Sequence, residues 1–81
     1  MAISFPAVEA FYWVAQLHSF KAAAERLHIT QPTVSYRIGE LEEQLGVVLF
    51  IRQRRQVTLT SEGEAMKRYA EAMIGIARDI E

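Results

Sequence analysis

Apolar residues recur every three or four positions along most of the chain, a pattern that predicts helices rather than strands. The first such stretch is "SFPAVEAFYWVAQL", residues 4–17. Ser4 can cap it, and Pro6 lies in the first turn, where its missing N–H group costs no hydrogen bond. The stretch therefore predicts one amphipathic helix. Its apolar stripe consists of Phe5, Val8, Phe11, Tyr12 and Ala15.

Two further helical stretches follow, separated by a short turn at His28 and Ile29. Ser19 can cap "FKAAAERL", whose three consecutive alanines favour a helix and let another helix approach closely. Thr30 can cap the next helix, which Gly46 is expected to end. Two helices joined in this way are typical of a helix-turn-helix. The buried stripe of the second helix is expected at Val34, Ile38, Leu41 and Leu45.

The segment "VVLFIRQRRQVTLT", residues 47–60, has no helical period and is rich in β-branched residues. It predicts two short strands, 49–52 and 56–59, around a turn at Gln53–Arg55. The turn contains neither Asn-Gly nor Asp-Gly, so the pattern leaves its type open. A helix-turn-helix that is followed by a two-stranded hairpin is a winged helix.

The last stretch is helix-permissive from residue 61 to the end of the chain. Thr60 or Ser61 can cap it, and Ser61 with Glu64 has the spacing of a capping box. Roughly 20 residues make a helix about 30 Å long, more than a small domain can cover, so we expect its heptad stripe to pack against a second copy. The stripe consists of Met66, Tyr69, Met73, Ile76 and Ile80.

Together these elements predict a mainly α chain. Residues 1–59 form a winged helix-turn-helix domain with three helices and a two-stranded wing. Residues 60–81 form a long linker helix for dimerisation, which we expect to be cut short before a further domain. The length of 81 residues suits one small domain.

Composition excludes several classes of protein. The chain has no cysteine, so it holds neither a disulfide nor a thiolate metal site. No apolar run approaches the roughly 18 residues of a membrane span, and the first residues lack the basic and apolar regions of a signal peptide. We therefore expect a soluble, cytoplasmic protein without membrane contact.

The net charge of −1 by itself argues weakly against a nucleic-acid partner, but net charge averages over surfaces that face different partners. Arg52, Arg54 and Arg55 place three of the nine basic residues within four positions. Wing arginines suit a narrow minor groove, whereas any one of them alone could be part of a solvated turn. Lys21 could meet the DNA backbone where the second helix crosses it.

The third helix is polar and uncharged in its first turn, but carries Glu40, Glu42 and Glu43 later. In a helix-turn-helix, the second helix of the pair enters the major groove and contacts bases with its N-terminal residues. Hydroxyl, amide and phenol groups can read base edges and phosphates, and Arg37 has the length to reach a phosphate or a guanine. A polar first turn alone is often just a capped helix in water. The candidate base-reading residues are Gln31, Pro32, Thr33, Ser35, Tyr36 and Arg37.

Three stretches of the chain resemble the N-terminal domain of the LysR-type transcriptional regulators: "SFKAAAERLHITQPTVSYRI" (19–38), "LEEQLGVVLFIR" (41–52) and "VTLTSEGE" (57–64). The resemblance implies sequence-specific binding of a double-stranded DNA operator by a bacterial regulator. It also implies a homodimer through antiparallel linker helices, with a tetramer in the full-length protein. A missing C-terminal domain is expected to bind a small-molecule effector, whereas residues 1–81 need no cofactor.

The resemblance also implies roles by position. The groove readers it implies are those named above except Arg37, and Arg55 is expected to reach toward the minor groove at the wing tip, with Arg54 beside it. The family often has arginine in place of Tyr36, and a phenol cannot make the two-pronged contact of guanidinium to guanine. The wing tip of the family often contains glycine, whereas here it is Gln-Arg-Arg-Gln. The implied backbone contacts are Ser19, Lys21, Thr30 and Arg52.

Two other functions are alternatives to DNA binding. A protein-interaction module could use the last helix alone, but it would have no need for three wing arginines. An enzyme is disfavoured because the only histidines, His18 and His28, lie at helix ends or turns without a nucleophile or ligand cluster at a useful spacing. We therefore predict that the chain binds DNA and is not an enzyme.

Overall fold

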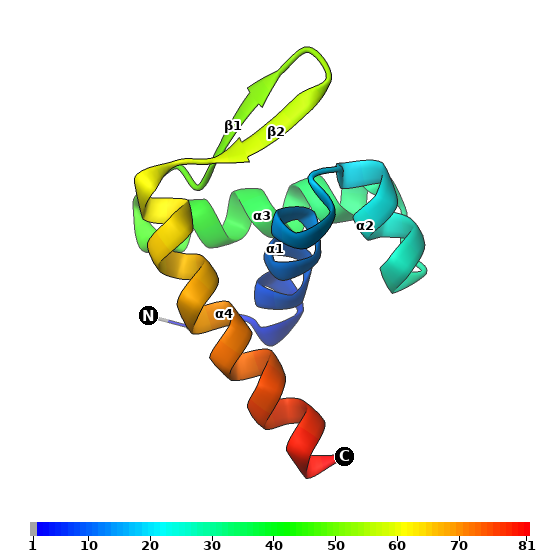
Figure 1. The fold of residues 1–81 in the computed structure, drawn as a ribbon, viewed down its shortest axis with the longest axis vertical. Coiled ribbons are helices and arrows are strands. Elements are labelled where there is room, and N and C mark those ends of the chain that lie inside the picture. Colours follow the sequence, from blue (N-terminus) through cyan, green and yellow to red (C-terminus); the bar gives the residue numbers. More distant parts are fainter. Residues whose placement is uncertain (1) are drawn as a thin grey trace.

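The computed structural model describes residues 2–81 and has four helices and one hairpin (Figure 1). The predicted winged helix-turn-helix with a long last helix is confirmed. The division at residues 59 and 60 remains a prediction, since α4 packs against α1 and β2. The elements are α1 (Phe5–Leu17), α2 (Phe20–Leu27), α3 (Gln31–Leu45), β1 (Phe50–Gln53), β2 (Gln56–Leu59) and α4 (Ser61–Ile80).

Each helix begins after a serine or threonine whose hydroxyl oxygen accepts a backbone N–H three residues later. At α4 the cap is Thr60, which accepts from the N–H of Gly63 at 2.9 Å. The predicted capping box of Ser61 with Glu64 is therefore wrong. Ser61 already lies inside the helix, where its hydroxyl donates to the Glu62 carboxylate at 3.1 Å. The other three caps are Ser4, Ser19 and Thr30.

The first three helices end at residues in the left-handed conformation. Gly46 ends α3 with φ of 70°, as expected for glycine. His18 ends α1 with φ of 54°, and His28 ends α2 with φ of 58°. The His28 N–H donates to the carbonyls of Ala24 and Glu25, closing the last turn. Both histidines are thus C-caps, and His28 shapes the turn of the helix-turn-helix.

The hydrophobic core surrounds α1, which lies in the middle of the molecule and packs against α2, α3 and α4 (Figure 1). Val34, Ile38 and Leu41 bury the predicted stripe of α3 fully, while Leu45 is half-buried. Phe11 of α1 meets Phe50 of β1 with ring centroids 5.2 Å apart, which joins the wing to the core. On α1 the predicted stripe is buried apart from Phe5, which is exposed at the start of the helix.

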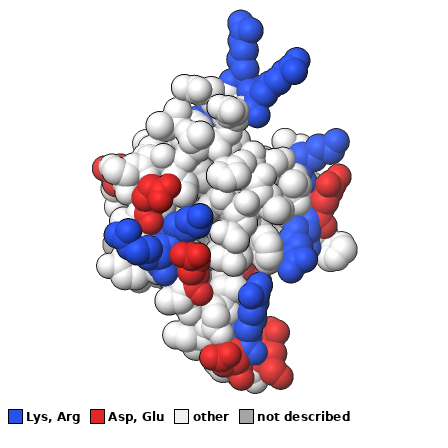
Figure 2. All heavy atoms as spheres, viewed as in Figure 1, with Lys and Arg blue, Asp and Glu red and all other residues white. Residues whose placement is uncertain are grey.

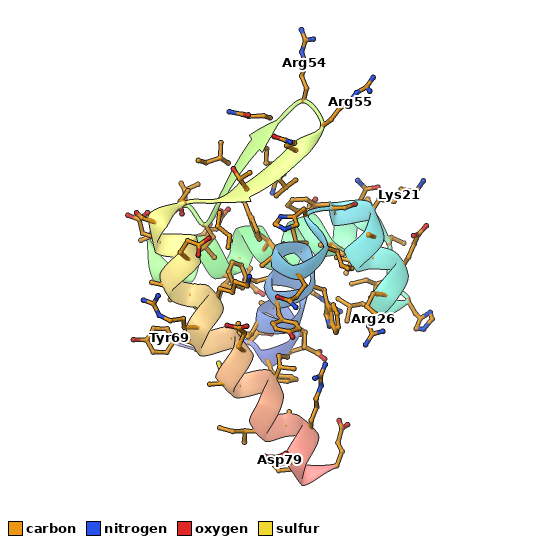
Figure 3. The ribbon with its side chains drawn as sticks, in the orientation of Figure 1. Lys21, Arg26, Arg54, Arg55, Tyr69 and Asp79 are labelled. Carbon is orange, nitrogen blue, oxygen red and sulfur yellow. The ribbon has the colours of Figure 1, made fainter. Side chains whose placement is uncertain are left out.

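The wing is a two-stranded antiparallel sheet in which Phe50 pairs with Leu59 and Gln53 pairs with Gln56. The turn therefore has two residues, Arg54 and Arg55, rather than the predicted three. Among residues 2–81, positive φ outside glycine occurs only at His18 and His28, so the turn is none of the types I′, II′ or II, which need it. Such a turn splays the strands, and the two arginines stand apart at the tip (Figure 3).

Helix α4 begins in close contact with the loop that precedes β1. Thr60 donates its N–H to the Leu49 carbonyl at 3.0 Å and its hydroxyl to the Val48 carbonyl at 2.6 Å. A Cβ atom on Gly63 would overlap the Leu49 carbonyl oxygen, so only glycine fits there. Beyond this anchor, Met66, Ala70 and Ile74 continue the inner face of α4 into the core.

Met66 lies on this inner face, with 9% of its surface exposed. The prediction that Met66 belongs to an outward-facing dimer stripe is therefore wrong, because its side chain is buried in the core. The heptad spacing did not distinguish the inner face of α4 from the outer one. The other four predicted members of the stripe are exposed: Tyr69, Met73, Ile76 and Ile80.

Candidate nucleic-acid interface

A concave surface lies between the starts of α2 and α3 and the wing. It brings together residues that are far apart in the chain, from three elements. Seven of its lining residues were predicted to contact DNA. They are Ser19, Lys21, Gln31, Ser35, Arg52, Arg54 and Arg55. The remaining lining residues are His18, Phe20, Gln53, Gln56 and Val57.

The first turns of α3 supply the polar side chains of this surface. Gln31 and Ser35 line the hollow, and Pro32 beside them is exposed. Thr33 is half-buried, and its hydroxyl oxygen lies 2.7 Å from that of Thr30. The Thr30 hydroxyl therefore both caps the helix and bonds to Thr33, which fixes the start of the recognition helix. Backbone N–H groups at a helix start also favour phosphate.

Tyr36 and Arg37 lie outside the hollow. Tyr36 is 71% exposed and projects from the outward side of α3, while Arg37 is half-buried nearer the core. Tyr36 lines a different hollow together with Gly39, Glu40 and Glu43. The six predicted base readers thus divide between the wing-facing side of α3 and its outermost side.

Arg52 is held by an aromatic ring. Its guanidinium carbon lies 4.3 Å from the centroid of the Phe20 ring. The ring centroids of Phe20 and Phe50 are in turn 6.0 Å apart. A guanidinium that stacks on a ring keeps its N–H edge free to bind phosphate. Alternation along β1 places Phe50 and Arg52 on one face, so the period of two could have indicated an aromatic partner for Arg52. Phe20 itself was missed as a functional residue.

The basic side chains of the interface project from one end of the molecule. Arg54 and Arg55 extend away from the wing tip, and Lys21 points outward from the start of α2 (Figure 3). In space-filling view, the side chains that reach furthest at the wing are basic (Figure 2). This end can attract a polyanion although the chain as a whole is slightly acidic.

One of the three acidic residues of α3 is turned into the fold. Glu42 accepts the backbone N–H of Leu49 through Oε2 at 2.8 Å, so its carboxylate braces the loop before β1. Glu40 is half-buried and Glu43 is exposed, both in the hollow beside Tyr36. The carboxylate of Glu42 is therefore held by a specific contact within the fold.

Neither a metal site nor a membrane-spanning helix is found among the described residues. Within residues 2–81, no three His, Asp or Glu side chains gather as a possible metal site. None of the helices in this described range has the length and hydrophobicity needed to cross a bilayer.

Residues 5–64 match the model of a protein family described as "Bacterial regulatory helix-turn-helix protein, lysR family". The chain belongs to this LysR family. The transcriptional regulator CfxR of Cupriavidus necator is 39% identical over 80 residues, which cover 99% of this chain and 25% of CfxR. The chain thus spans a quarter of that relative's length. The LysR family comprises transcriptional regulators rather than enzymes, which agrees with the prediction from sequence.

Solved structures of LysR-family proteins have the same fold. The BenM DNA-binding domain, crystallised with the catB site 1 DNA, superposes with a TM-score of 0.89 at 34% identity, over 95% of this chain and 86% of that one. OxyR of Corynebacterium glutamicum, in a C206S mutant described as H2O2-bound, gives a TM-score of 0.95 at 30% identity. It is matched by 99% of this chain but only over 26% of its own length.

Proposed function

We propose that this chain is the DNA-binding module of a bacterial LysR-family transcriptional regulator. The first turns of α3 enter the major groove of double-stranded DNA, and the wing reaches the adjacent minor groove. The observation that carries this proposal is the concave surface that joins Gln31, Arg52 and the wing tip. The BenM domain with the same fold was crystallised with DNA, which supports the proposal.

The residues divide into three roles: major-groove reading, backbone contact and minor-groove contact. Gln31 can bond bidentately to adenine, and Ser35 and Thr33 can bond to base edges or phosphates. Ser19, Lys21 and Arg52 hold the backbone, with Arg52 kept in place by Phe20. Arg54 and Arg55 enter the minor groove, where narrow A·T tracts concentrate negative potential. Tyr36 contacts the groove floor or its edge from the outermost side of α3.

The test is selection of bound duplexes from a random pool with the 81-residue chain. We expect enrichment of one motif, followed by binding that weakens steeply with salt in proportion to the phosphates neutralised. The double variant Arg54→Gln, Arg55→Gln should bind more weakly and lose preference for A·T-rich flanks. If no sequence is enriched, the module does not recognise DNA, and the protein-interaction function becomes the better explanation.

We further propose that the partner of α4 is a second copy of this chain. Ile76 is 61% exposed and Ile80 is 81% exposed, although both are large and apolar. The same side of α4 carries small residues between the large ones, which lets two such helices interlock. This side consists of Ala65, Tyr69, Ala72, Met73, Ile76 and Ile80.

An antiparallel arrangement makes this surface self-complementary. When the two-fold axis passes between Ala72 and Met73, Ala65 faces the partner's Ile80, and Tyr69 faces the partner's Ile76. Each small or planar side chain then meets a larger aliphatic one, with Ala72 facing the partner's Met73. Two DNA-binding modules on one axis would also match an operator with two half-sites.

The absence of cysteine makes this arrangement testable, because a single introduced thiol can cross-link only to its own copy. We expect Ala72→Cys to form a covalent dimer with a short thiol-reactive cross-linker. Glu71→Cys, which lies about 100° around the helix axis from Ala72 and outside the proposed contact, is the matched control and should remain monomeric. Equal cross-linking of both variants, or a monomer in sedimentation at high micromolar concentration, would contradict the dimer.

The longer relatives suggest what kind of full-length protein contains this module. The whole protein would contain a further domain that binds a small-molecule effector, since this chain matches only 25% of CfxR and 26% of OxyR. Such a protein would assemble from dimers into a tetramer and act in the cytoplasm, on the nucleoid. A full-length protein that stays dimeric in sedimentation would contradict the tetramer.

A further inference from the structure

Gly39 is a glycine that the fold does not require. It lies in the middle of α3 and is exposed, and among residues 2–81 no atom other than those of its chain neighbours and its own helix backbone lies within 4 Å of the position of an added Cβ. Glycine inside a helix is unfavourable relative to alanine. Gly46 and Gly63 differ, because the first has positive φ and the second abuts the Leu49 carbonyl. Nothing inside the molecule therefore explains glycine at position 39.

The position of Gly39 connects it to the proposed DNA surface. It follows Ser35 by one helical turn and lies about 40° from it around the helix axis, on the same flank of α3. Ser35 lines the hollow between α3 and the wing. Gly39 also lines the neighbouring hollow with Tyr36, which stands one turn earlier on the outward side. The missing side chain leaves a notch along this flank.

A DNA strand is expected along this flank. Adjacent major and minor grooves are separated by one sugar–phosphate backbone, so with α3 in one groove and the wing in the other, that backbone lies between them. Strands that border a groove run along it, and a helix in the groove therefore has a strand beside it. Ser35 and Gly39 are about 6 Å apart along the helix axis, roughly the spacing of successive phosphates.

The charges near Gly39 allow such an approach from the wing side. Glu42, the acidic residue on that flank, is bonded to the Leu49 N–H and faces the loop. Glu40 and Glu43 lie on the other side of Gly39, in the hollow with Tyr36. Their charges repel phosphate and so keep the strand on the side of Ser35.

We propose that Gly39 is the point of closest approach between α3 and the DNA backbone, where the absent side chain lets a sugar–phosphate unit sit against the helix. This inference rests on the proposed DNA binding. Gly39 thus sets the depth of the recognition helix in the groove. Its cost to helix stability is offset by closer contact of the first turns with the bases.

The test is Gly39→Ala, with binding measured on the duplex selected by the unchanged chain. Because the new methyl group meets open space in the free protein, the midpoint of thermal unfolding should rise by about 4–8 °C. Affinity for DNA should nevertheless fall about tenfold. Gly39→Leu should bind more weakly still. Both losses should be larger on the selected duplex than on unselected ones, because a helix that sits less deeply in the groove also loses its contacts with the bases.

Gly75→Ala is the matched control. Gly75 is also helical, exposed and free of atoms within 4 Å of an added Cβ in the described chain, but it lies on α4, away from the wing. It should gain thermal stability by a similar amount and keep full DNA affinity. If the unchanged chain binds DNA and Gly39→Ala binds equally well, the inference about Gly39 is overturned while the proposed function stands. If the unchanged chain binds no duplex, the proposed function itself fails.

Discussion

The two longest helices, α3 and α4, are anchored alike but present different surfaces to the outside. Both begin at a threonine cap, and both bury an apolar stripe against α1. The outward side of α3 begins with Gln31, Pro32 and Thr33, whereas the outward side of α4 carries Tyr69, Ile76 and Ile80. The inner sides decide where each helix lies, and the outward sides decide what each helix can bind.

The two helices also differ in how much of their length packs against the core. In α4, the core stripe ends at Ile74, and the last turns extend beyond the rest of the molecule (Figure 1). In α3, contacts with the core continue from Val34 to Leu45. A helix that is packed along its whole length presents its outward groups rigidly, which suits reading of bases, while a projecting end suits pairing with another helix.

The largest expected effect comes from breaking the anchor of α4. Gly63→Ala forces a methyl group into the Leu49 carbonyl oxygen, so the helix must move away from the loop before β1. We expect a loss of about 2–4 kcal/mol in the free energy of unfolding, as for severe overpacking. Chemical denaturation measures this loss. Gly75→Ala on the same helix should instead stabilise by up to about 1 kcal/mol, and equal stability of the two variants would contradict the account.

The second effect tests the outward side of α4. Ile76→Asp places a charge in the proposed dimer contact, where its desolvation opposes association, and the symmetric dimer contains it twice. Dimerisation should weaken by at least about 2 kcal/mol, while the fold is kept because Ile76 is exposed in the monomer. Analytical ultracentrifugation measures the dissociation constant. Arg68→Asp, on a different side of α4, is the control, and the same loss there would mean a general charge effect.

The third effect tests the outward side of α3. Gln31→Ala should cost about 1–3 kcal/mol of binding at one base pair and relax specificity there, because Gln31 reads a base. Arg52→Ala should weaken binding equally on all sequences and reduce the salt slope by about 1, because Arg52 binds phosphate. Titrations on duplexes with single base changes separate the two patterns. Equal loss on every sequence for Gln31→Ala would remove it from the base readers.

The ends of the helices and the buried face of α3 could be predicted from sequence, because helix caps and apolar stripes depend on residues that are close together in the chain. Ser19, Thr30 and Gly46 mark helix ends through hydrogen bonds to residues three or four positions away. The stripe of α3 was predicted correctly, since its burial repeats with the helical period. Seven of the candidate DNA-binding residues gather in one hollow because the helix-turn-helix and wing bring their segments together.

What could not be predicted depends on contacts between distant segments. Met66 fits both a heptad stripe and a core face, and only the packing of α4 on α1 decides between them. Thr60 rather than Ser61 caps α4 because its hydroxyl also reaches the Val48 carbonyl. The stacking of Arg52 on Phe20 joins residues that are far apart in the chain. Neither periodicity nor propensity contains this information.

The smallest effect concerns the starts of the two helices. The first turn of α4 contains Glu62 and Glu64, while that of α3 has no acidic residue, as expected if it faces phosphate. At Glu62, the backbone N–H, with the hydroxyls of Ser61 and Thr60, lowers the pKa of the carboxyl below its ordinary value. The folded state therefore favours the ionised form. Its contribution to stability is complete above about pH 4.3, the usual glutamate pKa, and is lost as pH falls through the lower folded pKa.

Glu62→Gln should remove this pH-dependent contribution and slightly lower stability at neutral pH, because the amide keeps the size but not the charge of the carboxylate. Thermal unfolding between pH 3 and 7 compares the variant with the unchanged chain. The converse substitution, Gln31→Glu, places a carboxylate in the first turn of α3, where the same helix dipole favours it. It should leave the fold intact yet reduce DNA affinity on every sequence through repulsion of phosphate. Unchanged affinity for this variant would mean that the start of α3 does not face the DNA.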